Sequence, residues 1–150
     1  MRFGGWWPDY VTRLVQKNKT SGWKDELHEV LEVNGKKEAL KGVLYHLSHR
    51  GITWILNKSI NYTQTEARLR FENGHPPVVW WRLFRVMLTE FWYRLIAKSG
   101  WRDGIVGWIE AIYQTFNMFI IYIRLWEMQK GKTMEQIYQD LDKQIVKNGF

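Results

Sequence analysis

The pattern of apolar and polar residues changes its period near residue 51. In the first fifty residues, Tyr10 to Gln16 and Glu29 to Val33 alternate apolar and polar side chains, which is the two-residue period of a half-buried strand. Asn34-Gly35 is a strong turn dipeptide, and it predicts a hairpin that Lys41 to Leu47 completes. We therefore expect residues 1–50 to form short strands and turns.

After residue 51 the spacing is helical. A first helix is predicted from Ile52 until Gly74-His75-Pro76-Pro77 ends it, a second from Val78 to Lys98, and a third from about Asp103 to Met128. The apolar face of the first helix is spaced at three and four residues and comprises Ile52, Ile55, Leu56, Ile60, Thr63 and Ala67.

A fourth helix begins at Thr133, with Gln136 three residues on in the capping-box pattern. Its apolar stripe is expected to pack on a neighbouring element, and consists of Met134, Ile137, Tyr138, Leu141 and Ile145. The expected fold class is α+β, with a short β-rich part over residues 1–50 and four mainly amphipathic helices over residues 51–150.

Composition and charge narrow the partners. The formal net charge is +7, from 22 Lys and Arg against 15 Asp and Glu, which favours polyanions, meaning nucleic acid, anionic lipid or a phosphorylated substrate, and charge alone does not choose among them. Ten Trp, seven Tyr and seven Phe favour bilayer interfaces or stacking on sugars and bases. No helix-turn-helix, zinc or RNA-recognition motif is present, so we expect no nucleic-acid partner. The absence of cysteine excludes disulfides, thiolate zinc sites and cysteine nucleophiles.

The second and third predicted helices indicate a membrane surface. The second mixes Trp, Phe and Tyr with Arg and Lys, as helices that lie in a bilayer interface do, although a buried bundle helix is the alternative. The third has Glu110 as its only formal charge between Gly104 and Ile123 and is borderline in length and apolarity for a span. Whether residues 104–123 cross the membrane or lie on it stays open.

Short motifs follow one another in a characteristic order over residues 3–128. They are Gly4-Gly5-Trp6-Trp7-Pro8-Asp9-Tyr10, Arg13-Leu14, Trp23, His28-Glu29, Leu44-Tyr45-His46, Lys58, Asn61-Tyr62-Thr63, Glu66-Ala67, Gly100-Trp101-Arg102-Asp103-Gly104 and Tyr122-Ile123-Arg124-Leu125-Trp126-Glu127. This ordered set resembles the distal, acceptor-side half of the GT-A core and the C-terminal region of family 2 glycosyltransferases related to the lipopolysaccharide core glucosyltransferases.

The resemblance implies inverting transfer of a sugar from a nucleotide-sugar donor to a lipid-linked or lipopolysaccharide-type glycan acceptor. It implies that Glu29 is the base that takes the proton of the acceptor hydroxyl, with His28 orienting it or the acceptor. It also implies that His46 helps to hold a divalent cation, Mg²⁺ or Mn²⁺, in the complete enzyme. The alternative for Glu29 is an ordinary exposed strand carboxylate. The alternatives are a surface histidine for His28 and a structural histidine for His46.

Seven further residues become candidate substrate ligands on the same resemblance. Gly4 and Gly5 would let the backbone approach donor or acceptor closely, or simply make a turn. The tryptophan rings could stack on a sugar face or pack in a core. Asp9 could bind hydroxyl groups and Arg13 phosphate, or the two could form a cross-strand ion pair. These rings and charges are Trp6, Trp7, Trp23, Asp9 and Arg13.

Part of the family pattern is not found in these 150 residues. Such enzymes place the nucleotide-sugar pocket and an Asp-x-Asp metal motif before the glycine loop, whereas Asp140-Leu141-Asp142 lies far downstream on the last helix and is interpreted as a solvated helix face. We therefore expect the chain to be inactive without a donor-binding half. The resemblance further implies action at the cytoplasmic face of the inner (plasma) membrane, as a peripheral or monotopic protein. The competing hypothesis is a non-catalytic helical module that binds a membrane or a partner.

Overall fold

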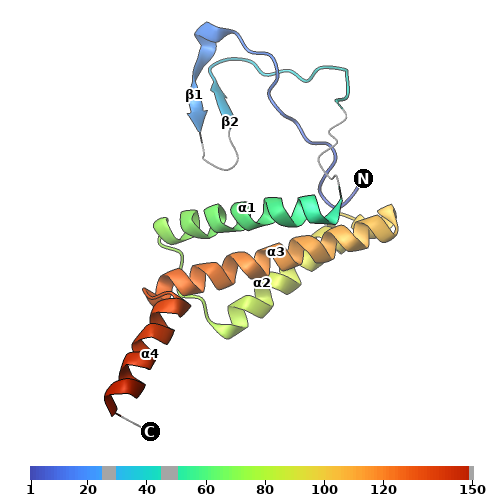
Figure 1. Ribbon diagram of the computed structural model, residues 1–150. Helices are drawn as coiled ribbons and strands as arrows, with labels where there is room; N and C mark the ends of the chain where they lie inside the picture. Colours follow the sequence, from blue (N-terminus) through green and yellow to red (C-terminus); the bar gives the residue numbers. More distant parts are fainter. Residues whose placement is uncertain (25–29, 45–50, 149–150) are drawn as a thin grey trace.

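The computed structural model describes residues 1–24, 30–44 and 51–148, and its main feature is a layer of three helices (Figure 1). In the view of Figure 1 the sheet lies above α1 and clear of the helical layer, and α4 projects from the end of the layer where α3 finishes. In chain order the elements are η1 (Lys17–Lys19), β1 (Thr20–Lys24), β2 (Val30–Val33), α1 (Ile52–Glu72), α2 (Trp80–Trp92), the π-helical turn η2 (Tyr93–Ala97), the 3-10 turn η3 (Gly100–Asp103), α3 (Ile105–Lys130) and α4 (Met134–Asn148). The predicted α+β class, with a small antiparallel sheet followed by four helices, is confirmed.

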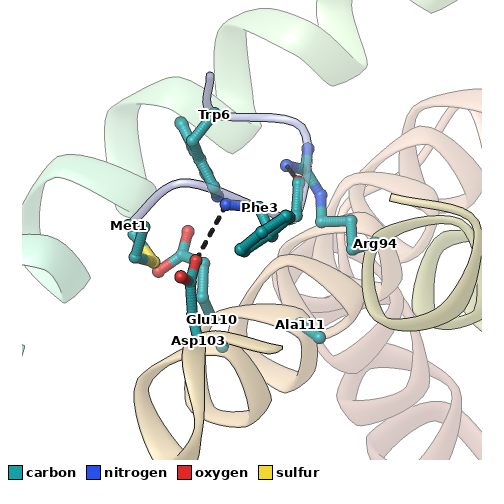
Figure 2. A pocket seen from close by; sticks show the side chains of 9 residues that line it. Met1, Phe3, Trp6, Arg94, Asp103, Glu110 and Ala111 are labelled. Atoms are coloured by element: carbon teal, nitrogen blue, oxygen red, sulfur yellow. Dashed lines mark hydrogen bonds between the residues drawn. The ribbon is translucent and has the colours of Figure 1, made fainter. Parts of the chain in front are cut away.

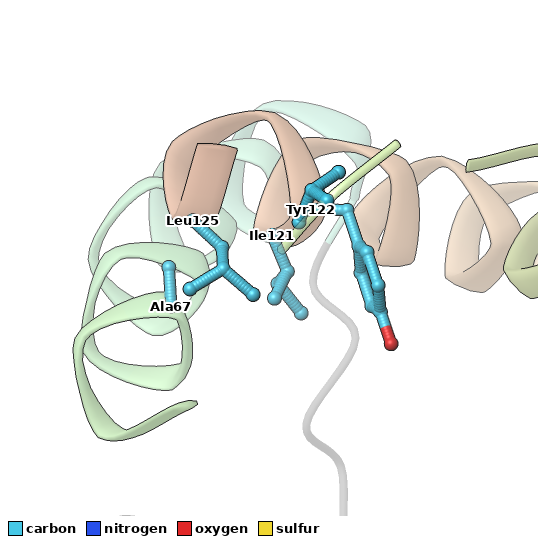
Figure 3. Packing of buried hydrophobic residues seen from close by; sticks show 5 residues of the cluster. Ala67, Ile121, Tyr122 and Leu125 are labelled. Atoms are coloured by element: carbon cyan, nitrogen blue, oxygen red, sulfur yellow. The ribbon is translucent and has the colours of Figure 1, made fainter. Parts of the chain in front are cut away.

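α3 is the central helix, packed against α1 and against α2. The main apolar core lies where the three meet, and Figure 3 shows Leu125 beside Ala67 and Ile121. Leu125 and Ala67 are fully buried, and burying each large aliphatic side chain stabilises the fold by about 1.5–3 kcal/mol. On α1 only the later part of the predicted apolar face is buried, at Thr63 and Ala67. Ile52 and Ile60 remain exposed.

The turn between α1 and α2 is fastened by Gln129 of α3. The Gln129 side-chain amide donates to the carbonyl of His75 at 3.0 Å, and its oxygen accepts the backbone N–H of Val78 at 2.8 Å. Gly74 has a φ of +68°, a left-handed conformation that favours glycine at a helix end. The predicted end of the first helix is therefore confirmed, and a side chain more than fifty residues away holds it.

The capping box of the last helix is confirmed. The Thr133 hydroxyl accepts the backbone N–H of Gln136 at 3.2 Å, and the Gln136 side chain accepts the Thr133 N–H at 2.9 Å. Lys132 donates to Asp140 at 2.5 Å, and this contact lowers the pKa of that carboxyl. Asp140 is ion-paired and part-exposed and Asp142 is exposed, in keeping with a solvated helix face.

The expectation that the α4 stripe packs on a neighbour is wrong, because α4 leaves the layer and its apolar side chains stay exposed (Figure 1). An amphipathic period predicts a helix, but it does not specify which surface covers the apolar side.

The strand predictions are partly wrong. β2 agrees with the predicted strand that ends at Val33, but it pairs with β1, with Trp23 opposite Leu31. Of the segment predicted to complete the hairpin, residues 41–44 form no strand, and residues 45–47 lie outside the described residues. Residues 10–16 are irregular and exposed, and so are residues 41–44. β1 has the sequence Thr-Ser-Gly-Trp-Lys, with one large apolar side chain, so it gives no alternating signal.

Candidate functional site

The glycine-aromatic segment at the start of the chain docks on the connection between α2 and α3. The backbone N–H of Gly4 donates to the carbonyl of Lys98 at 2.9 Å. The Asp103 carboxylate accepts the N–H of Phe3 at 2.9 Å and of Arg2 at 3.0 Å, as the dashed line to Asp103 in Figure 2 marks for one of them. Two motifs of the family resemblance, about a hundred residues apart, therefore lie in contact.

Glycine is required on both sides of this contact. Gly4 and Gly5 have φ values of +72° and +87°, in the left-handed region that favours glycine. A Cβ on Gly100 would lie 3.3 Å from the Gly4 Cα and 2.6 Å from the Arg94 carbonyl oxygen. The loop thus makes a turn and packs closely against the chain's own backbone at Gly100. The close approach of Gly4 and Gly5 to a donor or acceptor stays a prediction.

Trp6 packs under a guanidinium. The Arg94 guanidinium lies 5.2 Å from the centre of the Trp6 ring, pairs with Glu90 at 2.6 Å and donates to the Gly4 carbonyl at 3.4 Å. On the same segment, Arg102 lies 4.6 Å from the Phe3 ring centre. Trp6 is half-buried and packs within its own chain. Stacking of this ring on a sugar stays a prediction.

A small cavity lies beneath this segment, with Glu110 in its wall (Figure 2). Glu110 is buried and accepts a hydrogen bond from the Gln114 side chain at 2.8 Å. The free space is about 10 Å³, about the size of one water and far too small for a sugar. The lining residues are Met1, Phe3, Gly4, Trp6, Arg94, Asp103, Gly107, Glu110 and Ala111.

The other candidate substrate residues are not gathered there. Trp7, Asp9 and Arg13 lie on exposed, irregular chain, and Asp9 and Arg13 form no ion pair with each other. Trp23 is 68% exposed on β1. The structure does not bring these four residues together with Gly4 and Gly5 in one pocket.

The three residues assigned to chemistry, Glu29, His28 and His46, lie outside the described residues. Within 1–24, 30–44 and 51–148, no group of three or more His, Asp or Glu side chains could hold a metal ion. These residues therefore do not supply a site for the expected divalent cation by themselves.

A second, open hollow lies at the end of α1, between Glu66 and Pro76. Arg70 pairs with Glu66 at 2.7 Å and lies 5.6 Å from the Tyr122 ring centre, while the Tyr122 hydroxyl is 3.3 Å from His75. Burial, and then the Glu66 carboxylate, raise the pKa of Tyr62 above its ordinary value. The motifs named Glu66 and Tyr122, but no sequence signal pointed to the place of His75 beside them.

Comparison with known proteins does not assign either site. No protein-family model matches the chain, and no solved structure matches it. The candidate site therefore rests on its residues and their geometry.

Proposed function

We propose that the chain is the acceptor-side part of an inverting family 2 glycosyltransferase. It works at the cytoplasmic face of the inner membrane, where a sugar passes from a nucleotide-sugar donor to a lipid-linked or lipopolysaccharide-type acceptor. The donor-binding half, with its Asp-x-Asp motif, comes from other sequence. Without it the 150 residues are inactive.

One observation carries the proposal beyond the ordered motifs. The Gly4-Gly5 loop and the Gly100 to Gly104 segment are the motifs at nearly opposite ends of the resemblance, and they pack backbone against backbone. Residues that share a site tend to be brought together by the fold, whereas chance matches of single letters carry no such relation. The contact supports a common role for the two motifs, with η3 holding the loop in place.

The proposed transfer needs one carboxylate from this chain. The acceptor oxygen bonds to the anomeric carbon from the face opposite the leaving group, and the bond from that carbon to the nucleoside diphosphate breaks. The hydroxyl proton goes to Glu29, and the nucleoside diphosphate leaves with the bonding electrons. The resemblance places the main carboxylate ligands of the divalent cation in the donor-binding half.

The second candidate is a non-catalytic helical module. The observation that favours it is the small size of the cavity beneath the glycine loop. This cavity, lined by described residues, is too small to hold a sugar. The two candidates differ in what they demand of position 29, because a docking module needs no base there.

Glu29→Gln in the complete enzyme, carrying its donor-binding half, separates them. A general base contributes about 10²- to 10⁴-fold, so we expect the sugar-transfer rate to fall by at least about a hundredfold with the melting curve unchanged. Glu32→Gln is the matched control, since Glu32 is an exposed β2 carboxylate that contacts Lys24 and Ser21. Equal rates for E29Q and E32Q would eliminate the base assignment.

A further inference from the structure

An exposed apolar stripe runs along α3. Ile105, Ile109, Ile112 and Phe116 recur every three or four residues, so they share one side of the helix. All four are exposed, Ile105 to 73%. Glu110, the one formal charge between Ile105 and Ile123, is 7% exposed and lies at the cavity beneath the glycine loop. The exposed side of this stretch of α3 therefore carries no formal charge.

α2 adds a second stripe beside the first. Trp80, Phe84 and Leu88 follow one another at intervals of four residues and are 74%, 62% and 68% exposed. Phe91, three residues after Leu88, meets Trp108, three residues after Ile105, with ring centres 6.2 Å apart, so α2 and α3 are in contact next to both stripes. We call the two stripes together the apolar face, defined by Phe84, Leu88, Ile105, Ile109, Ile112 and Phe116.

Cations stacked on aromatic rings accompany this face on the same elements. Arg82 and Arg85 of α2 both lie against Trp81, at 5.2 and 5.4 Å from the ring centre, and Lys98 lies 5.3 Å from that of Tyr93. Within the part of the chain that the structure describes, these three cations form no ion pair. Arg85 and Lys98 are exposed, whereas Arg82 is half-buried and donates to the Pro77 carbonyl at 3.0 Å. The positive charges of Arg85 and Lys98 are thus open to an anionic partner, and Arg82 adds its charge beside them.

We infer that the apolar face lies on the surface of an anionic lipid bilayer, with Phe84, Leu88 and the α3 isoleucines among the acyl chains and Arg82 and Arg85 against headgroup phosphates. An uncharged strip accompanied by aromatic rings and unpaired cations matches the layers of a bilayer interface. A second copy of a chain of net charge +7 would bring these unpaired cations together. Among the described residues, no helix combines the length and apolarity needed to cross a bilayer.

This inference rests on the membrane part of the proposed function and is independent of the sugar chemistry. Co-sedimentation of the 150-residue chain with phosphatidylcholine vesicles, and with equimolar phosphatidylcholine and phosphatidylglycerol vesicles, tests it without a transfer assay. We expect tight binding to the anionic vesicles only. Because each surface cation contributes about a fivefold gain near anionic lipid, R82Q/R85Q should weaken binding by up to about 25-fold, and high salt should also weaken it.

The apolar contribution is tested by I109S/I112S, which changes two exposed residues of the face. The matched control is L141S/I145S, which changes two exposed isoleucine or leucine side chains on α4. We expect I109S/I112S to lose most of the vesicle binding and L141S/I145S to keep it. Equal binding by both variants, or loss in L141S/I145S alone, overturns the inference.

Two further measurements keep the test decisive if I109S/I112S folds poorly. The chain has no cysteine, so I112C and I145C each accept a single polarity-sensitive dye. On anionic vesicles the dye at residue 112 should shift to shorter wavelength and the dye at residue 145 should not. Failure of the chain to bind either vesicle, or a lipid-free dimer that I109S/I112S dissociates, would mean that a protein surface covers the face instead.

Discussion

The Asp103 carboxylate accepts the backbone N–H of Phe3 at 2.9 Å, across a hundred residues of sequence. Asp103 ends the short turn before α3, and Phe3 precedes the glycine loop. One side chain therefore fixes the start of the described chain to the helical layer, at the place where Gly4 meets Gly100.

Removing this carboxylate should release the segment. In Asp103→Ala the N–H groups of Arg2 and Phe3 lose a charged acceptor, so we expect about 1–3 kcal/mol lower free energy of unfolding in urea. Hydrogen exchange at Arg2 and Phe3 should also become faster. Asp103→Asn keeps one acceptor oxygen and should lose less. Asp142→Ala, on exposed α4, is the control, and an equal effect of D142A and D103A would contradict the anchoring role.

Gly107 should not tolerate a methyl group. A Cβ there would lie 1.9 Å from the carbonyl oxygen of Gly100, which is backbone and cannot rotate away. We expect Gly107→Ala to lower the thermal midpoint and to cost about 3 kcal/mol by overpacking. At Gly42 nothing lies within 4 Å of the corresponding position, so Gly42→Ala should leave the midpoint nearly unchanged. A neutral G107A would show that α3 does not sit this close to η3.

The helices were predictable because their signals are local. The 3.6-residue period, the Gly74 to Pro77 stop and the Thr133 capping box each act within a few residues, and the structure has all of them. The pairing of β1 with β2 was not predictable, since Gly22 and the polar residues of β1 give no alternation. Partner choice between weak strands depends on the whole chain, not on a short pattern.

The candidate site also has features that the sequence predicted and features that it did not. Gly4, Gly5 and Asp103 were present in the motifs, and glycine pairs mark turns by their own backbone freedom. Their contact with one another depends on how α2 and α3 pack, which no local pattern encodes. The burial of Glu110 shows this too, because the sequence reveals a charge in an apolar stretch but not the side of the layer it occupies.

Gln129 should contribute more to the free energy of unfolding than other exposed or half-exposed glutamines do. Gln129→Ala leaves the Val78 N–H and the His75 carbonyl without this partner, so we expect about 1–2 kcal/mol lower unfolding free energy in urea. Gln129→Glu can still accept from Val78 but cannot donate to His75, and should fall between wild type and Q129A. Gln139→Ala, on the exposed side of α4, should be neutral, and a Q129A that matched it would rule out the clamp.

The capping box of α4 offers a test confined to one helix. Thr133→Ala removes the hydroxyl that accepts the Gln136 N–H, and replacing such a cap with alanine typically costs about 1 kcal/mol. Because α4 projects from the layer, the loss should speed amide exchange in the first turn of α4 while the midpoint of global unfolding barely moves. Thr65→Ala is the matched control: its hydroxyl bonds the carbonyl of Asn61 within α1, where alanine is the better helix former. If T133A lowered the global midpoint as much as a core substitution such as Leu125→Ala does, α4 would have to unfold together with the three-helix layer, and its exposed stripe would need a partner within the same chain.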